Sequence, residues 1–155
     1  MPEVRDLKIK ILGELDAMLP DDVILATNSS SYTSSEIFER VKNKDRLINM
    51  HYYMPPQSNP VEIMPNPHTS PEIAPLLYQE AAKHGLYPYH VRKESVGLIA
   101  NRIWAAIKRE SLYVVAEGVA KPEEVDEAGS TTPVRALQDL SLIHISEPTR
   151  LLSIS

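Results

Sequence analysis

Apolar residues recur along the chain with helix-like spacing in some segments and in short continuous runs in others. The first helix is predicted from four residues spaced by four, four and three positions: Leu7, Ile11, Leu15 and Met18. That helix should end near Pro20. Residues 22–27 then form a short apolar run with β-branched side chains, which is typical of a strand buried on both faces of a parallel sheet.

Three more strands are predicted by similar short runs, at residues 46–50 (continuing into 51–53), 61–64 and 87–91. Met54, Pro55 and Pro56 should end the second of these, because proline lacks the donor that strand pairing needs.

Helices are predicted between and after these strands. Ser34 can cap a short helix that runs to about Val41. Ser70 followed by proline predicts a helix start, and that helix should end at Gly85. A longer helix follows Gly97, with an inner face formed by Ile99, Ile103, Ile107 and Val114 or Val115. A further short helix opens at residues 121–126 by the same proline rule. Strands that alternate with helices and then give way to helices predict an α/β domain followed by a helical one.

Composition excludes several classes of function. The formal net charge of −5 argues against a nucleic-acid-binding surface, which needs a basic face. The sequence has no cysteine, so disulfides, thiolate metal sites and cysteine nucleophiles are excluded, and no His-rich metal spacing is present. No apolar run is long enough to cross a bilayer, so we expect a soluble, intracellular protein without a membrane partner.

Candidate chemistry centres on His51, which lies where a predicted strand ends, at the ligand-binding edge of open parallel sheets. Glu62, eleven positions on, can reach the imidazole from the next strand, fix its tautomer and favour its protonated form. From spacing alone, an ordinary surface histidine is the simpler interpretation. Asn28 and Ser30 can bind a ligand oxygen or a cofactor ribose, or serve only turn and capping roles. Asn101 needs hydrogen-bond partners near the start of an apolar helix. His68, His84 and His90 are expected to be surface residues.

Residues 140–155 differ from the rest of the chain. The run from Leu140 to Arg150 matches the in-frame translation of a transposase-type sequencing-library adapter. We therefore predict that residues 140–155 are a non-native tail, and we assign His144 no function.

Six segments in register resemble the 3-hydroxyacyl-CoA dehydrogenase family over roughly residues 1–139. They are Pro2–Glu3 with Asp6–Lys8, Ile24–Ser31, Asn49–Tyr53, Pro60–Ile63, Gly97–Arg102, and Glu117–Val119 with Pro122–Asp126. The resemblance implies the second half of a Rossmann-type NAD-binding domain over residues 1–95, and the start of an all-helical C-terminal domain over residues 96–139.

The resemblance also implies a function and its site residues. In the family, a histidine at the position of His51 takes the proton of the substrate's 3-hydroxyl while hydride passes to NAD, and a glutamate at the position of Glu62 orients it. Ser30 and Asn101 align with residues that contact the substrate oxygen or complete the catalytic group. Cofactor-contacting positions align with Glu3, Lys8 and Asn28. The implied substrate is a 3-hydroxyacyl-CoA of fatty acid metabolism, and the implied full-length assembly is a homodimer.

Two departures from the family pattern concern the binding of the cofactor or the substrate. Met54 stands where the family usually has asparagine, and none of the five glycines forms the G-x-G-x-x-G turn that holds a dinucleotide pyrophosphate. Because that turn supplies backbone donors at a helix terminus, we expect this fragment alone to bind NAD weakly and to be inactive. Calorimetric titration of the 155-residue chain with NAD tests this, and micromolar binding would contradict it.

Two alternatives remain open from sequence. One is a non-catalytic interaction module derived from such an enzyme, which Met54 favours slightly. The other is a small hydroxy-acid dehydrogenase with a lysine base on the long helix, where Lys108 lies seven positions after Asn101. The second alternative leaves the His51 and Glu62 pair unexplained.

Overall fold

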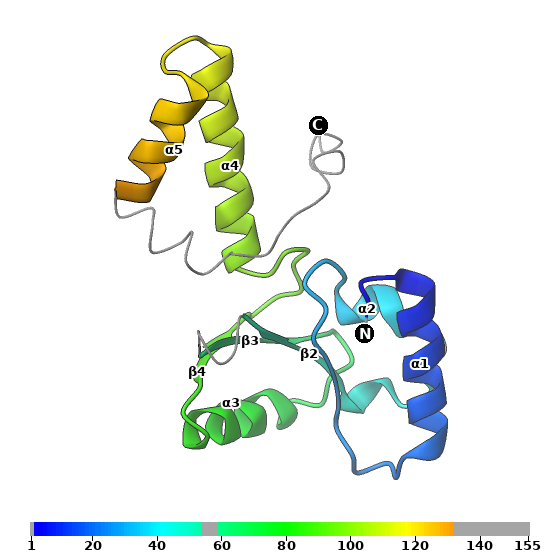
Figure 1. The fold of residues 1–155 in the computed structure, drawn as a ribbon. Helices are drawn as coiled ribbons and strands as arrows, with labels where there is room; N and C mark the ends of the chain where they lie inside the picture. The colour runs from blue at the N-terminus through cyan, green and yellow to red at the C-terminus, as the bar shows by residue number, and fades with distance from the viewer. Residues whose placement is uncertain (1, 54–58, 132–155) are drawn as a thin grey trace. The chain divides into compact units, whose positions relative to one another are not determined.

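A computed structural model of the chain describes residues 2–53 and 59–131 (Figure 1). Contacts divide the chain into two units, Met1–Ile99 and Ala100–Ser155. The first unit is α/β and the second is helical, as the sequence predicts. The domain bounds predicted from sequence stay a prediction, as does the non-native tail, which lies outside the described residues together with Met54, Pro55 and Pro56.

The first unit is built on a four-stranded sheet in the order β1-β2-β3-β4. The strands are β1 (Leu25–Thr27), β2 (Leu47–Tyr52), β3 (Pro60–Pro65) and β4 (Tyr87–His90). The β1–β2 and β3–β4 pairs are parallel, whereas β2 and β3 are antiparallel. The carboxyl ends of β1 and β2 therefore lie at the same edge of the sheet as the start of β3.

Helices cover the two faces of this sheet. Alternate residues of a strand point to opposite faces, so Leu47 of β2 packs with α1 (Arg5–Met18) and α2 (Ser34–Ile37) on one face. Ile48 and Met50 pack with α3 (Ile73–Lys83) on the other. A short 3-10 helix, η1 (Lys44–Arg46), leads into β2. The core thus forms two layers on either side of β2 and β3.

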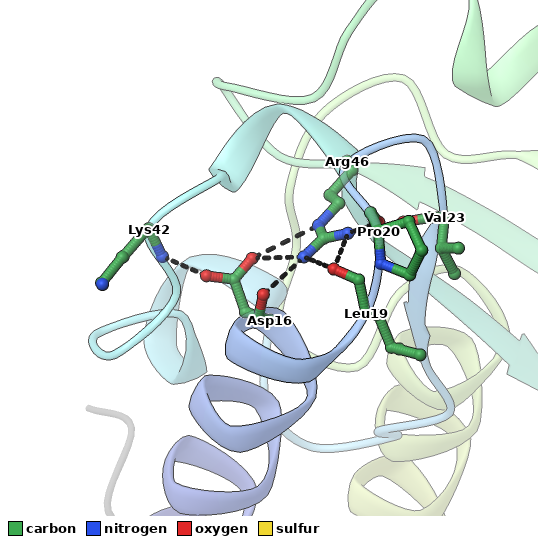
Figure 2. Close-up of polar contacts among 6 residues, drawn as sticks. All are labelled: Asp16, Leu19, Pro20, Val23, Lys42 and Arg46. Atoms are coloured by element: carbon green, nitrogen blue, oxygen red, sulfur yellow. Dashed lines mark hydrogen bonds and ion pairs between the residues drawn. The ribbon is translucent and has the colours of Figure 1, made fainter.

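The buried face of α1 differs from the predicted stripe. Met18 is 79% exposed and Leu15 is 37% exposed, while the buried residues of α1 are Lys8, Ile9, Leu12 and Asp16. The two buried charges are possible because each has a partner: Lys8 pairs with Glu3, and Asp16 pairs with Arg46 (Figure 2). Hydrophobic spacing cannot detect a helix face that is partly built from paired charges.

Other element boundaries differ from the sequence prediction for local reasons. α3 begins at Ile73 rather than Pro71, and its first helical bond runs from the Leu76 N–H to the Glu72 carbonyl. A start at Pro71 would require Pro75 to donate to the Pro71 carbonyl, which proline cannot do. The end of α3 agrees with prediction, because Gly85 adopts φ 76° just beyond it.

α2 and β1 are also shorter than predicted. Thr33, not Ser34, precedes α2, and its N–H donates to Glu36 Oε2 at 2.8 Å.

β1 is confined to Leu25–Thr27, and Ala26 is exposed, so the prediction of burial on both faces is wrong. The physical reason is that α3 packs on β3 and β4, which leaves the Ala26 side of β1 open within the described residues.

The second unit contains α4 (Ala100–Ala116) and α5 (Pro122–Thr131), which pack against each other. Pro122 is the first residue of α5, as the sequence predicts. No residue of α4 or α5 is fully buried. The predicted inner face of α4 is covered in part: Ile107, Val114 and Val115 are half-buried, whereas Ile103 is 43% exposed. No described helix is long and apolar enough to cross a membrane.

Candidate active site

His51 and Glu62 face each other across the β2–β3 pair. They are direct partners in the antiparallel register, and His51 Nδ1 lies 3.0 Å from Glu62 Oε2. Opposed residues of an antiparallel pair project to the same face of the sheet, which explains the contact. Both side chains are buried, His51 at 3% exposure and Glu62 at 0%. The structure therefore brings together the two residues that the sequence analysis paired.

The contact sets the chemistry of the imidazole. An ionised carboxylate only accepts hydrogen bonds, so with Glu62 ionised the proton of this contact belongs to His51 Nδ1, which would donate it to Glu62 Oε2. The lone pair of the neutral ring is then on Nε2, which can accept a proton from a substrate. The carboxylate would also stabilise the cation that forms. The pair has the arrangement of a base and the group that orients it.

Two further groups meet this pair, and sequence reasoning missed both. The second carboxylate oxygen of Glu62, Oε1, accepts the backbone N–H of Ile99 at 2.8 Å. The Tyr53 ring lies against the His51 ring, with centroids 5.5 Å apart. Burial and then the negative charge of Glu62 raise the pKa of the Tyr53 phenol well above its usual range, so Tyr53 stays a neutral phenol. Tyr53 was within a motif used for the family resemblance, but nothing in its spacing indicated this position.

Hydrogen bonds hold the loop that follows β1 against β2. Asn49 of β2, fully buried, donates from Nδ2 to the carbonyls of Ser29 (3.1 Å) and Tyr32 (3.2 Å). Asn28 Oδ1 accepts the Tyr52 N–H at 2.8 Å. These bonds tie the loop to the end of β2, where His51 lies. Ser30 is half-buried in the same loop, at the same edge of the sheet.

Glu3 and Lys8 form the other support of this loop. Lys8, 3% exposed, places Nζ 2.8 Å from Glu3 Oε2. Glu3 Oε1 accepts the Ser31 N–H at 2.9 Å and also the Ser29 hydroxyl. Burial acts to raise the pKa of Glu3, but the hydrogen bonds from Lys8, Ser29 and Ser31 outweigh it and hold that pKa below its ordinary value. The carboxylate is thus ionised and engaged with the loop.

The remaining candidates are placed as follows. Asn101 lies half-buried in the first turn of α4, in the second unit, so its relation to His51 stays a prediction. His68, His84 and His90 are exposed, as expected, and His68 packs edge-on against Phe38 at 5.5 Å. Among the described residues, no group of three or more histidines or acidic residues is placed to hold a metal ion.

Comparison with known proteins identifies the family of this chain. The model of the 3-hydroxyacyl-CoA dehydrogenase NAD-binding domain matches residues 1–95, and the model of that family's C-terminal domain matches residues 97–147. The second match overlaps the predicted non-native tail, which therefore stays a prediction.

Individual proteins show the same similarity. The chain is 46% identical over 92 residues to the 3-hydroxyacyl-CoA dehydrogenase-like protein LAM1 of Cochliobolus heterostrophus, covering 59% of this chain and 19% of that protein. It is 36% identical over 128 residues to an L-carnitine dehydrogenase of Pseudomonas sp, covering 82% of this chain and 40% of that protein.

A solved structure agrees with the sequence matches. The (S)-3-hydroxybutyryl-CoA dehydrogenase of Ralstonia eutropha superposes with a TM-score of 0.77 at 34% identity, over 84% of this chain and 46% of that one. The chain therefore spans less than half the length of these relatives. The matched domains, together with the α/β and helical units, show that this chain belongs to the 3-hydroxyacyl-CoA dehydrogenase family of NAD-dependent oxidoreductases.

Proposed function

We propose that this chain carries the catalytic part of a dehydrogenase that oxidises the 3-hydroxyl of a 3-hydroxyacyl-CoA-type substrate with NAD. The observation that carries the proposal is the buried His51–Glu62 pair, 3.0 Å apart, at the carboxyl end of β2. Ligands of open α/β sheets bind at that edge. A proton acceptor held there by a carboxylate suits the oxidation of an alcohol.

Each candidate residue has a separate role in the proposed reaction. His51 Nε2 accepts the hydroxyl proton, and Glu62 holds the ring and stabilises the imidazolium. Ser30, on the loop after β1, and Asn101, on α4, are our candidates for the residues that contact the substrate oxygen or complete the catalytic group. When bound, NAD supplies the acceptor for the hydride that leaves the same carbon. The proton and the hydride thus leave to different acceptors.

The candidates for cofactor contact are the residues that align with cofactor-contacting positions of the family. Asn28 is exposed at the edge of the sheet, and the Glu3–Lys8 pair fixes the loop that holds Ser30. These three residues are our candidates for cofactor contact. The printed sequence offers no glycine-rich turn for the pyrophosphate. We therefore place the activity in a longer protein that includes such a turn, and propose a homodimer for that protein.

An assay of such a protein tests the proposal. The part of the chain that precedes the predicted tail is joined to the dinucleotide-binding half encoded by its own upstream reading frame and to the rest of the helical domain of the same gene, to give what we call the extended protein. We expect NADH-dependent reduction of acetoacetyl-CoA, followed at 340 nm as NADH is consumed. If the extended protein binds NADH but reduces no 3-oxoacyl-CoA, the proposed activity is wrong.

A second candidate substrate is a small hydroxy acid. The similarity to an L-carnitine dehydrogenase, over 82% of this chain, favours it. The same His51–Glu62 pair would remove the hydroxyl proton, and no lysine base would be required. Activity with L-carnitine and NAD, in the absence of activity with acyl-CoA substrates, would select this candidate.

A further inference from the structure

The segment 94–99, which we call the strap, is hydrogen-bonded at both ends to other parts of the α/β unit. At one end, Glu94 Oε1 accepts the Ser35 N–H at 3.0 Å, and Oε2 accepts the Ser35 hydroxyl at 2.5 Å. At the other end, the Ile99 N–H donates to Glu62 Oε1 at 2.8 Å. The strap therefore joins the N-terminus of α2 to the carboxylate that faces His51.

The end of the strap at Glu62 has an unusual backbone. Gly97 and Leu98 both adopt left-handed conformations, with φ of 75° and 49°. Glycine adopts this conformation freely, whereas a leucine there is strained and must be held by its surroundings. Leu98 is 2% exposed, packs with Met64 and Val91, and donates its N–H to the Ser95 carbonyl at 3.0 Å. Burial of its side chain thus maintains a backbone shape that leucine would otherwise avoid.

We propose that Leu98 is a positioning residue whose left-handed backbone aims the Ile99 N–H at Glu62 Oε1, so that Oε2 stays directed at His51. The inference rests on the proposed function, because it gives the strap a role in the His51–Glu62 pair. A terminal carboxylate turns easily about its last torsion. A backbone donor on one oxygen, held by a buried side chain, restricts that rotation in a way that a mobile side-chain donor would not.

A pair of substitutions separates the backbone effect from packing. Leu98→Ile keeps the same number of carbons, but its β-branched side chain opposes a positive φ. Leu98→Met also keeps an apolar side chain of similar volume and is not branched at Cβ. In the extended protein we expect Leu98→Ile to lower kcat by ~10- to 100-fold with KM for NADH unchanged, because small misplacement of a catalytic group has effects of this size. Leu98→Met should stay close to wild type.

Nuclear magnetic resonance of the same protein gives a readout independent of activity. Imidazole ¹⁵N shifts should show a proton on His51 Nδ1 in wild type and in Leu98→Met, and a mixture of tautomers in Leu98→Ile. The Ile99 amide proton should move upfield in Glu62→Gln, because its charged acceptor is lost. This second measurement decides the matter if Leu98→Ile does not fold.

The outcomes distinguish this inference from the proposed function. An Ile99 amide that does not respond to Glu62→Gln overturns the inference, as does an equal loss of kcat in Leu98→Ile and Leu98→Met. If the tautomer and amide shifts respond as expected but the extended protein has no dehydrogenase activity, the positioning role stands and the proposed function fails.

Discussion

Replacing His51 with asparagine in the extended protein is expected to lower kcat for 3-oxoacyl-CoA reduction by ~10²- to 10⁴-fold, the usual contribution of a general acid or base. Nε2 of this ring is the group that the structure leaves for substrate, since Nδ1 is engaged with Glu62 at 3.0 Å. Asparagine retains polarity and approximate size at this buried position but cannot exchange the proton. Binding of NADH, measured by fluorescence titration, should change little.

Glu62→Gln provides a companion test of the same pair. A glutamine amide can donate to Nδ1, which would leave the proton on Nε2, the wrong tautomer for accepting one from an alcohol. The corresponding change in a serine protease triad lowers kcat by about 10⁴-fold, so we expect a loss comparable to that of His51→Asn.

A matched control is available on the neighbouring strand. His90 is exposed on β4, and His90→Asn makes the same chemical change outside the candidate site. It should leave kcat unchanged. Retention of more than a tenth of wild-type kcat by His51→Asn would show that this imidazole is not the group that moves the proton.

The His51–Glu62 contact could be anticipated from sequence because it depends on strand geometry. A histidine at the end of one apolar run and a glutamate inside the next predict facing residues once the two strands pair. The structure adds the antiparallel register of β2 and β3, in which His51 and Glu62 are direct partners. From spacing alone an ordinary surface histidine was the simpler interpretation, and it is wrong, because His51 is 3% exposed. The pairing was favoured by the family resemblance rather than by the local pattern.

The supports of the site could not be anticipated in the same way. The donor to Glu62 Oε1 is a backbone N–H, which every residue except proline has, so residue type carries no signal at Ile99. The Glu94–Ser35 contact joins residues 59 positions apart in different elements. The sequence predicts Asn49 only as part of a strand, whereas its amide also fixes the loop that contains Ser30. Such contacts depend on tertiary packing.

The elements themselves were predicted better than their buried faces. Helices and strands appear in the predicted order because apolar periodicity and proline or glycine punctuation are local signals. The face of α1 was wrong because Lys8 and Asp16 are buried, and periodicity treats charged residues as exposed. The inner face of α4 is predicted in part, because Ile107 and Val114 are half-buried whereas Ile103 is exposed.

Arg46→Met is expected to destabilise the α/β unit by ~3–5 kcal/mol, the usual effect of removing one partner from a buried ion pair. Arg46 and Asp16 are each about 4% exposed, with Nη2 2.9 Å from Oδ1 (Figure 2). The guanidinium also donates to the carbonyls of Asp16 at 2.8 Å, Leu19 and Pro20, the last residues of α1 and the turn that follows. Methionine fills similar space but satisfies none of these acceptors. Urea unfolding of the extended protein, followed by circular dichroism, measures the change.

The control and the pH dependence identify the buried charge as the cause. Arg5 pairs with Asp6 at 3.9 Å and with Glu39 at 3.8 Å, but these side chains are largely exposed, so Arg5→Met should cost less than ~1 kcal/mol.

Burial acts to raise the pKa of Asp16, yet hydrogen bonds from the Lys42 N–H and Arg46 outweigh it and keep that pKa below its ordinary value. A carboxyl with a lowered folded pKa stabilises the fold above its unfolded pKa, and this stability is lost as pH falls below ~4. Arg46→Met should therefore reduce the difference in unfolding free energy between pH 7 and pH 3, because the main cationic partner of Asp16 is gone. Equal destabilisation by Arg5→Met, or a pH dependence unchanged by Arg46→Met, would mean that the buried pair does not stabilise this end of α1.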